Sequence, residues 1–398
     1  MKFLVKLLSF LTLGPHSNYL CMLGCYTHCR MGVKANIVTR RKYLTTGRAF
    51  SNTSVDNIIK GIVYHSASTD VFHNLAFEDW VYNNLDLTHS DVLLLWCNSP
   101  CVVVGRHQNP WAECNHRVVE GSKVKVARRR SGGGTVYHDR GNLNCSFFTS
   151  RERYNRQKNL KTIISGVKRR WPLVDLEATC RDDIMLNKDF KISGSASRLG
   201  RDIAYHHCTL LHSCNKDMLL EVLNVKSNGI THKATASVPS PVKNLGDMDA
   251  RVYHESLIQT IADQFYTERE PLGKPVIYDV DPSDAQIWPG VHSYREELQS
   301  WKWVYGKTPP FSIQRGDDTL SVLIHVSQGN ISGVIVRYVS DEILINSIQQ
   351  LCASLKGLPF TRNDVRSACN VFLHAAILQE QQKNKLAQVC SLIQDAVS

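Results

Sequence analysis

The chain has 398 residues, of which 43% are hydrophobic and 21% charged, a composition typical of a globular protein rather than a fibre or a disordered tail. The formal net charge of +11 would suggest a nucleic-acid-binding protein, but eight Lys and Arg residues precede the first acidic residue, Asp56. Beyond them the chain carries 39 basic and 36 acidic side chains. This near balance argues against nucleic acid as a partner, and no apolar run is long enough to suggest a membrane span.

Residues 1–50 have the composition of a mitochondrial transit segment, because they contain basic residues such as Arg40 and Arg41 but no acidic ones. A secretory signal is the alternative, since Lys2 and Lys6 precede an apolar run at residues 7–13. That run is short and lacks a clean cleavage site after it. We therefore predict a transit segment and a mitochondrial matrix location.

Apolar periodicity predicts alternating strands and helices after this leader. The turn signal at residues 98–100 lies between two β-branched and leucine-rich runs, which we expect to form a hairpin. The expected helices are Asp70–Leu85, Asn159–Trp171, Met218–Leu223 and Tyr253–Phe265. The expected strands are Gly61–Ser66, Val92–Trp96, Val102–Gly105, Lys123–Ala127, Leu143–Thr149, Asp189–Ile192 and Cys208–His212.

Four prolines between residues 271 and 289 indicate an irregular connection, so we place a domain boundary near Gly290. The prediction is a catalytic domain at 56–290 and a small accessory domain at 291–398. In the second domain we expect strands and then helices, at Phe311–Gln314, Leu320–His325, Ile331–Val336 and finally Gln379–Val397.

The segment RRRSGGGTVYHDRGNLN, Arg128–Asn144, contains three adjacent glycines within a set of polar and cationic side chains. Because Gly132, Gly133 and Gly134 have no Cβ, their backbone N–H groups can close around a phosphate or a carboxyl-derived oxygen. A triple glycine alone would indicate only a tight turn. The flanking groups favour an anion site instead, and they are Arg128, Arg129, Arg130, Ser131, Tyr137, His138 and Asn142.

A second motif, KISGSAS, begins at Lys191 on an expected strand. Ser193 and Gly194 beside it allow a ligand to approach closely. A movable ammonium next to a phosphate-binding loop suits an acyl phosphate, where it would stabilise charge that develops during transfer. The alternative is a solvated lysine with no chemical role.

No protein-bound metal is expected. His206 and His207 are adjacent, so on a strand their side chains would point to opposite faces. The 13 cysteines are scattered without the paired spacing of a metal site or a disulfide framework, which predicts reduced thiols.

These motifs resemble the lipoate–protein ligase and lipoyltransferase family, and within it the mitochondrial branch. The resemblance covers about residues 60–315 and is carried in order by GRHQNPWAECN, the glycine segment, KISGSAS, AYHHCTLL, ATASVPSPVKNL and WVYGKTPPFSI. It implies an α+β fold, in which a biotin/lipoate ligase-like catalytic domain with mixed sheets and flanking helices is followed by a small C-terminal α+β domain.

The resemblance also implies roles for individual residues. Lys191 would be catalytic and would touch both the carbonyl and the phosphate of lipoyl-AMP. The remaining positions would bind this substrate: Arg129, Ser131, Gly133, Gly134, Thr135, Val136, Tyr137, His138, Asn142, Arg181, His207, Thr209, Val238 and Ser240.

The implied activity is transfer of a lipoyl group to a lysine of the lipoyl domains in 2-oxoacid dehydrogenase complexes. The donor would be lipoyl-AMP or the lipoylated glycine cleavage H protein, with no tightly bound cofactor and a monomeric enzyme. Arg130, Asp182 and Cys208 depart from the bacterial ligase pattern and call activation of lipoate into question. The alternatives are a complete ligase that uses ATP and Mg, and a binding protein without catalysis, against which Lys191 argues.

Overall fold

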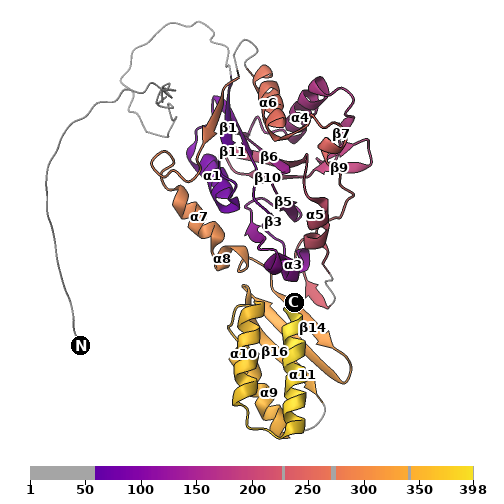
Figure 1. Ribbon diagram of the computed structural model, residues 1–398. Helices are drawn as coiled ribbons and strands as arrows, with labels where there is room; N and C mark the ends of the chain where they lie inside the picture. Colours follow the sequence, from indigo (N-terminus) through magenta and orange to yellow (C-terminus); the bar gives the residue numbers. More distant parts are fainter. Residues whose placement is uncertain (1–58, 226–228, 270–274, 339–341, 398) are drawn as a thin grey trace, which may run out of the picture. The chain divides into compact units, whose positions relative to one another are not determined.

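The computed structural model describes residues 59–225, 229–269, 275–338 and 342–397 (Figure 1). The predicted transit segment, residues 1–50, lies outside the described residues. Within these ranges the chain forms α-helices together with mixed β-sheets, which confirms the expected α+β fold. None of the helices in these ranges is both long and apolar enough to cross a membrane.

The largest sheet has six strands in the order β10-β11-β6-β2-β1-β13. β1 runs parallel to β2 and β13, whereas the pairs β2/β6, β6/β11 and β11/β10 are antiparallel. The strands are β1 (Lys60–Ser66), β2 (Ser90–Trp96), β6 (Asn142–Ser150), β10 (Ser195–Leu199), β11 (Ile203–Leu211) and β13 (Ile277–Val280). β11 begins at Ile203 rather than at the predicted Cys208. The two histidines before Cys208 interrupt the apolar pattern in the sequence, but in the structure His206 and His207 stay within the strand and form hydrogen bonds to other elements.

Helices cover both faces of this sheet, which explains why its strands read as continuous apolar runs. On one face Leu93 and Leu95 of β2 share a hydrophobic cluster with α4 (Arg156–Arg170) and α6 (His254–Thr267), which are neighbours in Figure 1. On the other face Leu94 shares a cluster with α1 (Val71–Asn84) and α7 (Val291–Gln299). The pleat of β2 thus divides the core into two layers.

A three-stranded sheet in the order β4-β3-β5 carries the glycine loop, and its strands are β3 (Cys101–Val104), β4 (Lys125–Arg128) and β5 (Val136–His138). The predicted hairpin between β2 and β3 is wrong. Both edges of β2 are occupied by β1 and β6, and both edges of β3 by β4 and β5, so the two strands lie in different sheets. Residues 129–135 cross from one edge of β3 to the other. They pass so close to its end that a Cβ on Gly105 would lie 2.1 Å from the Gly133 carbonyl oxygen.

The second motif lies on another three-stranded sheet, β7-β8-β9. Its strands are β7 (Leu176–Ala178), β8 (Ile184–Leu186) and β9 (Phe190–Ser193), which carries Lys191. Short helical segments complete this part of the chain: α2 (Pro110–Glu113), α3 (His116–Gly121), α5 (Lys216–Leu223), the 3-10 turn Leu245–Asp247 and α8 (Trp301–Val304).

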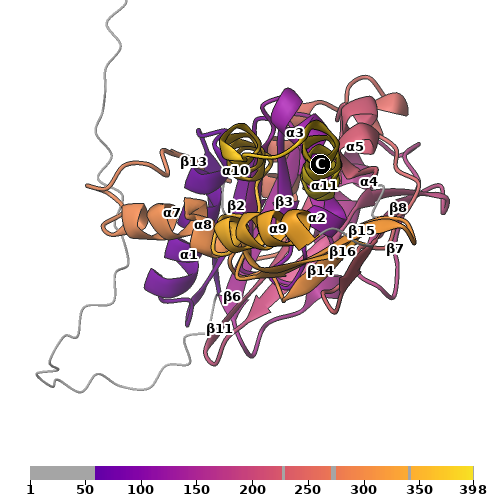
Figure 2. The same ribbon diagram turned by 90° about the horizontal axis from the view of Figure 1, so that it is seen from below.

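The remaining sheet has the order β12-β14-β15-β16 and one face covered by three helices (Figure 2). Its elements are β12 (Ile230–His232), β14 (Phe311–Gly316), β15 (Leu320–Ser327), β16 (Asn330–Tyr338), α9 (Glu342–Leu355), α10 (Arg362–Ala375) and α11 (Glu380–Ala396). The domain boundary near Gly290 stays a prediction. Val291, Leu298 and Trp303, just after it, share the cluster that contains α1, whereas Phe311 belongs to the cluster of this sheet.

Arg128 is a fully buried structural residue, although the sequence places it at the start of the glycine loop. Its guanidinium donates to the carbonyl oxygens of Gly105, Arg106 and Gln108 at 2.9–3.1 Å. It also donates to the carbonyl oxygens of Trp303 and Val304 and to the hydroxyl of Thr308. Burial lowers the pKa of Arg128 to about 10, so the side chain is charged at neutral pH. One side chain therefore ties residues 105–108 to residues 303–308.

We expect Arg128→Met to destabilise the fold by about 3 kcal/mol or more, because buried carbonyl oxygens from both segments would lose their donor. Urea denaturation measures this change. Arg201→Met is the control, since Arg201 is exposed and should change stability by less than about 0.5 kcal/mol. Equal stability of the two variants would contradict a structural role for Arg128.

Candidate active site

The glycine loop is held in shape by Arg129. Its buried guanidinium donates to the carbonyl oxygens of Gly132 and Gly134 at 2.6–2.7 Å and to that of Val103 at 3.0 Å. Gly133 has φ +84°, a conformation that favours glycine, and it is exposed. Because Arg129 takes the carbonyl oxygens on the inside of the turn, it acts as a brace for the loop.

Ser131, His207 and Glu78 form a hydrogen-bonded series behind the loop. His207 lies 2.8 Å from the Ser131 hydroxyl through Nε2 and 2.8 Å from the Glu78 carboxylate through Nδ1. Ser131 also accepts a bond from Arg129 Nε at 3.0 Å, and it is only 1% exposed. The order serine, histidine, carboxylate is that of a nucleophilic triad. Here the serine is buried and already bonded twice, so the series fixes the loop to β11 and α1 instead.

Glu78 is a buried carboxylate that stays ionised. Burial by itself raises its pKa, but the charge of His207 and the hydrogen bonds from His207 and Ser146 outweigh this effect. The pKa of Glu78 therefore lies below its ordinary value. Glu78 was not predicted from the sequence, where it reads as one more residue of an amphipathic helix.

Lys191 faces a carboxylate on the neighbouring turn. Its Nζ lies 2.9 Å from Asp183 Oδ1, and the two side chains are 25% and 18% exposed. A Cβ on Gly194 would lie 3.2 Å from Lys191 Cε, so glycine leaves room for the side chain. Asp183 was also missed, since nothing in the sequence distinguishes it from its neighbour Asp182.

The start of β10 brings the two motifs together. A Cβ on Gly133 would lie 3.4 Å from Ala196 Cβ and 3.7 Å from the Ser195 carbonyl oxygen. One residue earlier, Gly194 lies against the Lys191 side chain, and its N–H donates to the Thr209 hydroxyl oxygen at 3.0 Å. The glycine loop and Lys191 thus contact adjacent residues of one short segment, 194–196, with Thr209 and His207 on the strand beside it.

His138 and Asn142 are buried behind the loop, and each has one polar atom without a protein partner. Asn98 donates to His138 Nδ1 at 3.1 Å, and burial lowers the pKa of His138 to about 3, so the neutral ring carries its proton on Nε2. Among the described residues neither His138 Nε2 nor Asn142 Oδ1 has a hydrogen-bond partner. Buried groups of this kind are typical of positions where a bound molecule completes the hydrogen bonding.

Several predicted residues lie away from these contacts. Tyr137 is buried in a hydrophobic cluster with Val102, and Val136 packs against the cluster around α1. Arg181 is exposed on the turn that presents Asp183, and Val238 and Ser240 are also exposed. The side chains of these five residues therefore do not share the contacts that join the glycine loop to Lys191.

Arg130 is engaged by carboxylates rather than directed to the loop. It lies 2.7 Å from Asp79 and contacts Glu297, and its guanidinium stacks 3.9 Å from the Trp303 ring. The three adjacent arginines therefore all bind protein groups, which corrects the expectation that they form a cationic rim for an anion.

Gln108, Glu113 and Ser237 form a further cluster against the loop that the sequence did not reveal. The Ser237 hydroxyl accepts from the Thr135 N–H at 2.8 Å, and Gln108 accepts from the Thr135 hydroxyl at 2.8 Å. All three lie inside segments that carry the family resemblance, GRHQNPWAECN for Gln108 and Glu113 and ATASVPSPVKNL for Ser237, and this position is the signal that could have identified them.

The site can bind an anion and stabilise a developing negative charge, since it combines glycine-loop amides with the Lys191 ammonium. His206 and His207 face opposite sides of β11, as predicted: His206 bonds to Ser195 and His207 to Ser131. In the described part of the chain no group of three or more His, Cys, Asp or Glu side chains has the arrangement of a metal site.

Residues 70–266 match the family model described as the lipoyl protein ligase A/B catalytic domain. The chain is 39% identical to the human mitochondrial lipoyl amidotransferase over 341 residues, which cover 84% of this chain and 91% of that protein. It is 32% identical to lipoate-protein ligase A of Psychrobacter cryohalolentis over 312 residues, or 77% of this chain and 90% of that one. Among solved structures, P. falciparum LipL1 in complex with lipoate has a TM-score of 0.53 at 23% identity, covering 84% of this chain and 99% of that chain, a likeness of fold.

The lowered pKa of Glu78 predicts a specific dependence of stability on pH. Its stabilising effect is present above the ordinary glutamate pKa and is lost as pH falls through the lower value of the folded state. We expect Glu78→Gln to be less stable at pH 7 by about 1–3 kcal/mol, and to lose less stability than the wild type between pH 5 and about pH 2. Denaturation across this range tests it, with the exposed Glu177→Gln as control. Parallel curves for Glu78→Gln and wild type would refute the assignment.

Proposed function

The chain belongs to the lipoyl protein ligase A/B family, and on that premise we propose that it transfers a lipoyl group from lipoyl-AMP to a lysine of a protein lipoyl domain. It is a lipoyltransferase and acts in mitochondria, like its human relative. The acceptors are the lipoyl domains of 2-oxoacid dehydrogenase complexes.

The observation that carries this proposal is the position of Lys191. Its ammonium lies beside Gly194, and the glycine loop contacts the next two residues of the same segment. A donor phosphate bound by the amides of Gly132–Gly134 would place its ester oxygen and the adjoining carbonyl near the ammonium. Asp183 holds the ammonium in place until the donor arrives.

The reaction is an acyl transfer in which one bond to the carbonyl carbon breaks and another forms. The ε-amine of the acceptor lysine attacks the lipoyl carbonyl carbon, the carbon–nitrogen bond of the amide forms, and the carbon–oxygen bond to the phosphate breaks. AMP leaves with the electron pair of that bond, and the amine proton passes to solvent. Lys191 stabilises the carbonyl oxygen as it becomes negative and then the departing phosphate.

Two features argue against nucleophilic catalysis by the protein itself. Ser131 is buried and already bonded to Arg129. Cys208 is 3% exposed and lies opposite Cys145 in the β6/β11 pair, inside the core. Direct attack by the acceptor amine is therefore the mechanism that the geometry supports best.

The alternative function, a complete lipoate ligase, differs in that the enzyme would make its own lipoyl-AMP donor from lipoate and ATP. The bacterial relatives are lipoate ligases, but Arg130, at a position where this chain departs from their pattern, is bound by Asp79 and Glu297. Since this arginine is not directed to the loop, it supplies no extra charge for ATP phosphates. This supports a preformed donor, either lipoyl-AMP or the lipoylated H protein.

We expect the chain from residue 51 onward to lipoylate a recombinant lipoyl domain when given lipoyl-AMP, and to give no product with free lipoate, ATP and Mg. Intact mass spectrometry of the acceptor measures both. Product from both mixtures would establish a complete ligase. If neither mixture yields product, the lipoylated H protein is tested as donor, and failure there as well would leave the binding protein.

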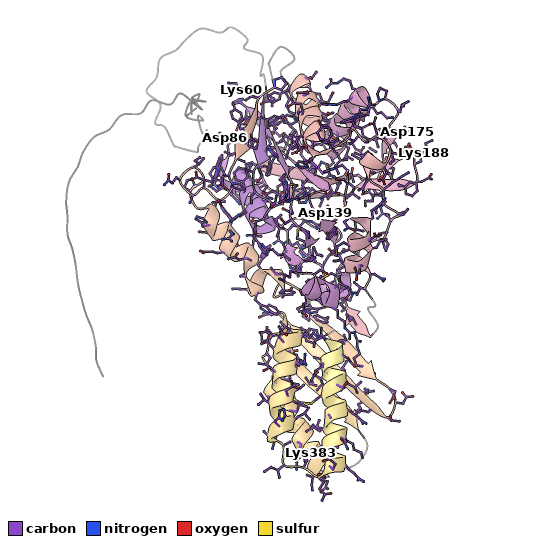
Figure 3. All side chains as sticks on the ribbon, in the orientation of Figure 1. Lys60, Asp86, Asp139, Asp175, Lys188 and Lys383 are labelled. Atoms are coloured by element: carbon purple, nitrogen blue, oxygen red, sulfur yellow. The ribbon has the colours of Figure 1, made fainter. Side chains whose placement is uncertain are left out.

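We expect Lys191→Ala to reduce the rate of transfer from lipoyl-AMP by at least about 100-fold, because it removes a charge needed in the transition state. Single-turnover kinetics with the lipoyl domain measure this rate. Lys188→Ala is the matched control, since Lys188 is exposed on the turn that leads into β9 (Figure 3). A normal rate in Lys191→Ala would remove this lysine from the mechanism.

A further inference from the structure

Residues 234–243, which we call the strap, connect the two motifs of the site. At one end the Lys191 N–H donates to the Pro241 carbonyl oxygen at 2.9 Å, and the Lys243 N–H donates to the Lys191 carbonyl oxygen at 3.4 Å. At the other end the Thr235 N–H donates to the His107 carbonyl oxygen at 3.3 Å. The strap therefore runs from the backbone of Lys191 to the loop that follows β3.

Ser237 is the point where the strap is fastened to the glycine loop. Ser237 is partly buried, whereas all the remaining residues from Thr235 to Pro241 are exposed. Its hydroxyl accepts from the Thr135 N–H at 2.8 Å and from Gln108 Nε2 at 3.0 Å, and it donates to the Glu113 carboxylate. Its own N–H donates to the same carboxylate at 3.2 Å.

This fastening uses all the hydrogen-bonding capacity of one hydroxyl. Two bonds accepted and one donated saturate a serine, and Glu113, only 8% exposed, depends on Ser237 for its contacts to the strap. A Cβ on Gly134 would lie 3.1 Å from the Ser237 hydroxyl oxygen, so the third glycine of the loop admits the strap. With the Thr135 N–H taken, the amides of Gly132–Gly134 are the ones left to bind a donor.

We propose that Ser237 is a positioning residue that locks the strap over the glycine loop and thereby sets how long the adenylate donor stays bound. The inference rests on the proposed function. Because the strap holds Lys191 at one end and the loop at the other, its release would open the donor site between them. The acyl transfer itself, which depends on Lys191, would continue whenever the donor is bound.

The test uses a non-hydrolysable sulfamoyl analogue of lipoyl-AMP and stopped-flow measurement of its dissociation from the chain lacking residues 1–50. Loss of the hydroxyl removes the bonds to Thr135 and Glu113, so we expect Ser237→Ala to release the analogue roughly tenfold faster. The KM for lipoyl-AMP should rise by a similar factor, while kcat at saturating donor changes less than about threefold.

Matched variants separate this role from a general effect on folding. Ser237→Thr keeps the hydroxyl and should restore slow release. Thr235→Ala removes an exposed hydroxyl from the same strap and should leave the dissociation rate unchanged. Glu113→Ala leaves the Thr135 bond in place, so it should give a smaller increase than Ser237→Ala.

A dissociation rate in Ser237→Ala equal to that of the wild type, with an unchanged melting temperature, would overturn the inference. So would a fall in kcat without faster release, since Ser237 would then act on the chemical step. A wild-type chain that neither binds the analogue nor transfers lipoyl would instead overturn the proposed function, and the inference with it.

Discussion

The arrangement of the site depends on the buried guanidinium of Arg128. A full positive charge is satisfied there by five carbonyl oxygens and one hydroxyl, drawn from residues 105–108 and 303–308. These bonds fix the end of β3, over which the glycine loop crosses. Because successive residues of a strand point in opposite directions, Arg129 turns into the loop when Arg128 turns away from it. The brace and the loop that it shapes thus lie against the end of the strand that Arg128 fixes.

The charged side chains near the loop bind protein atoms, so the backbone N–H groups of the loop are the groups that we propose bind the ligand. Arg129 takes loop carbonyl oxygens, Arg130 takes carboxylates, and His207 joins Glu78 to Ser131. Because Arg129 occupies the carbonyl oxygens of Gly132 and Gly134, these atoms are bonded within the protein, and an arrangement formed in advance suits an anion without requiring reorganisation when it binds. Lys191 differs, since its single carboxylate partner lies on a turn at the surface and its side chain is partly exposed.

Much of the fold could be read from periodicity, because strands buried on both faces and amphipathic helices leave strong patterns. The hairpin between β2 and β3 could not, since a turn signal reports a change of direction and not which strands pair. The first residues of β11 could not be predicted from the sequence for a related reason. Two histidines look like the end of a buried strand until their partners on other elements are known.

The sequence by itself determined the two motifs and the family, because a glycine-rich loop and a lysine beside serine and glycine are local features. Only the tertiary structure decided which charges serve the ligand and which serve the fold. Asp183 meets Lys191, Glu78 meets His207, and Ser237 meets Thr135 across separations in the chain that no local pattern records. The reason is physical: a buried polar group is defined by its partner, and the partner comes from another element.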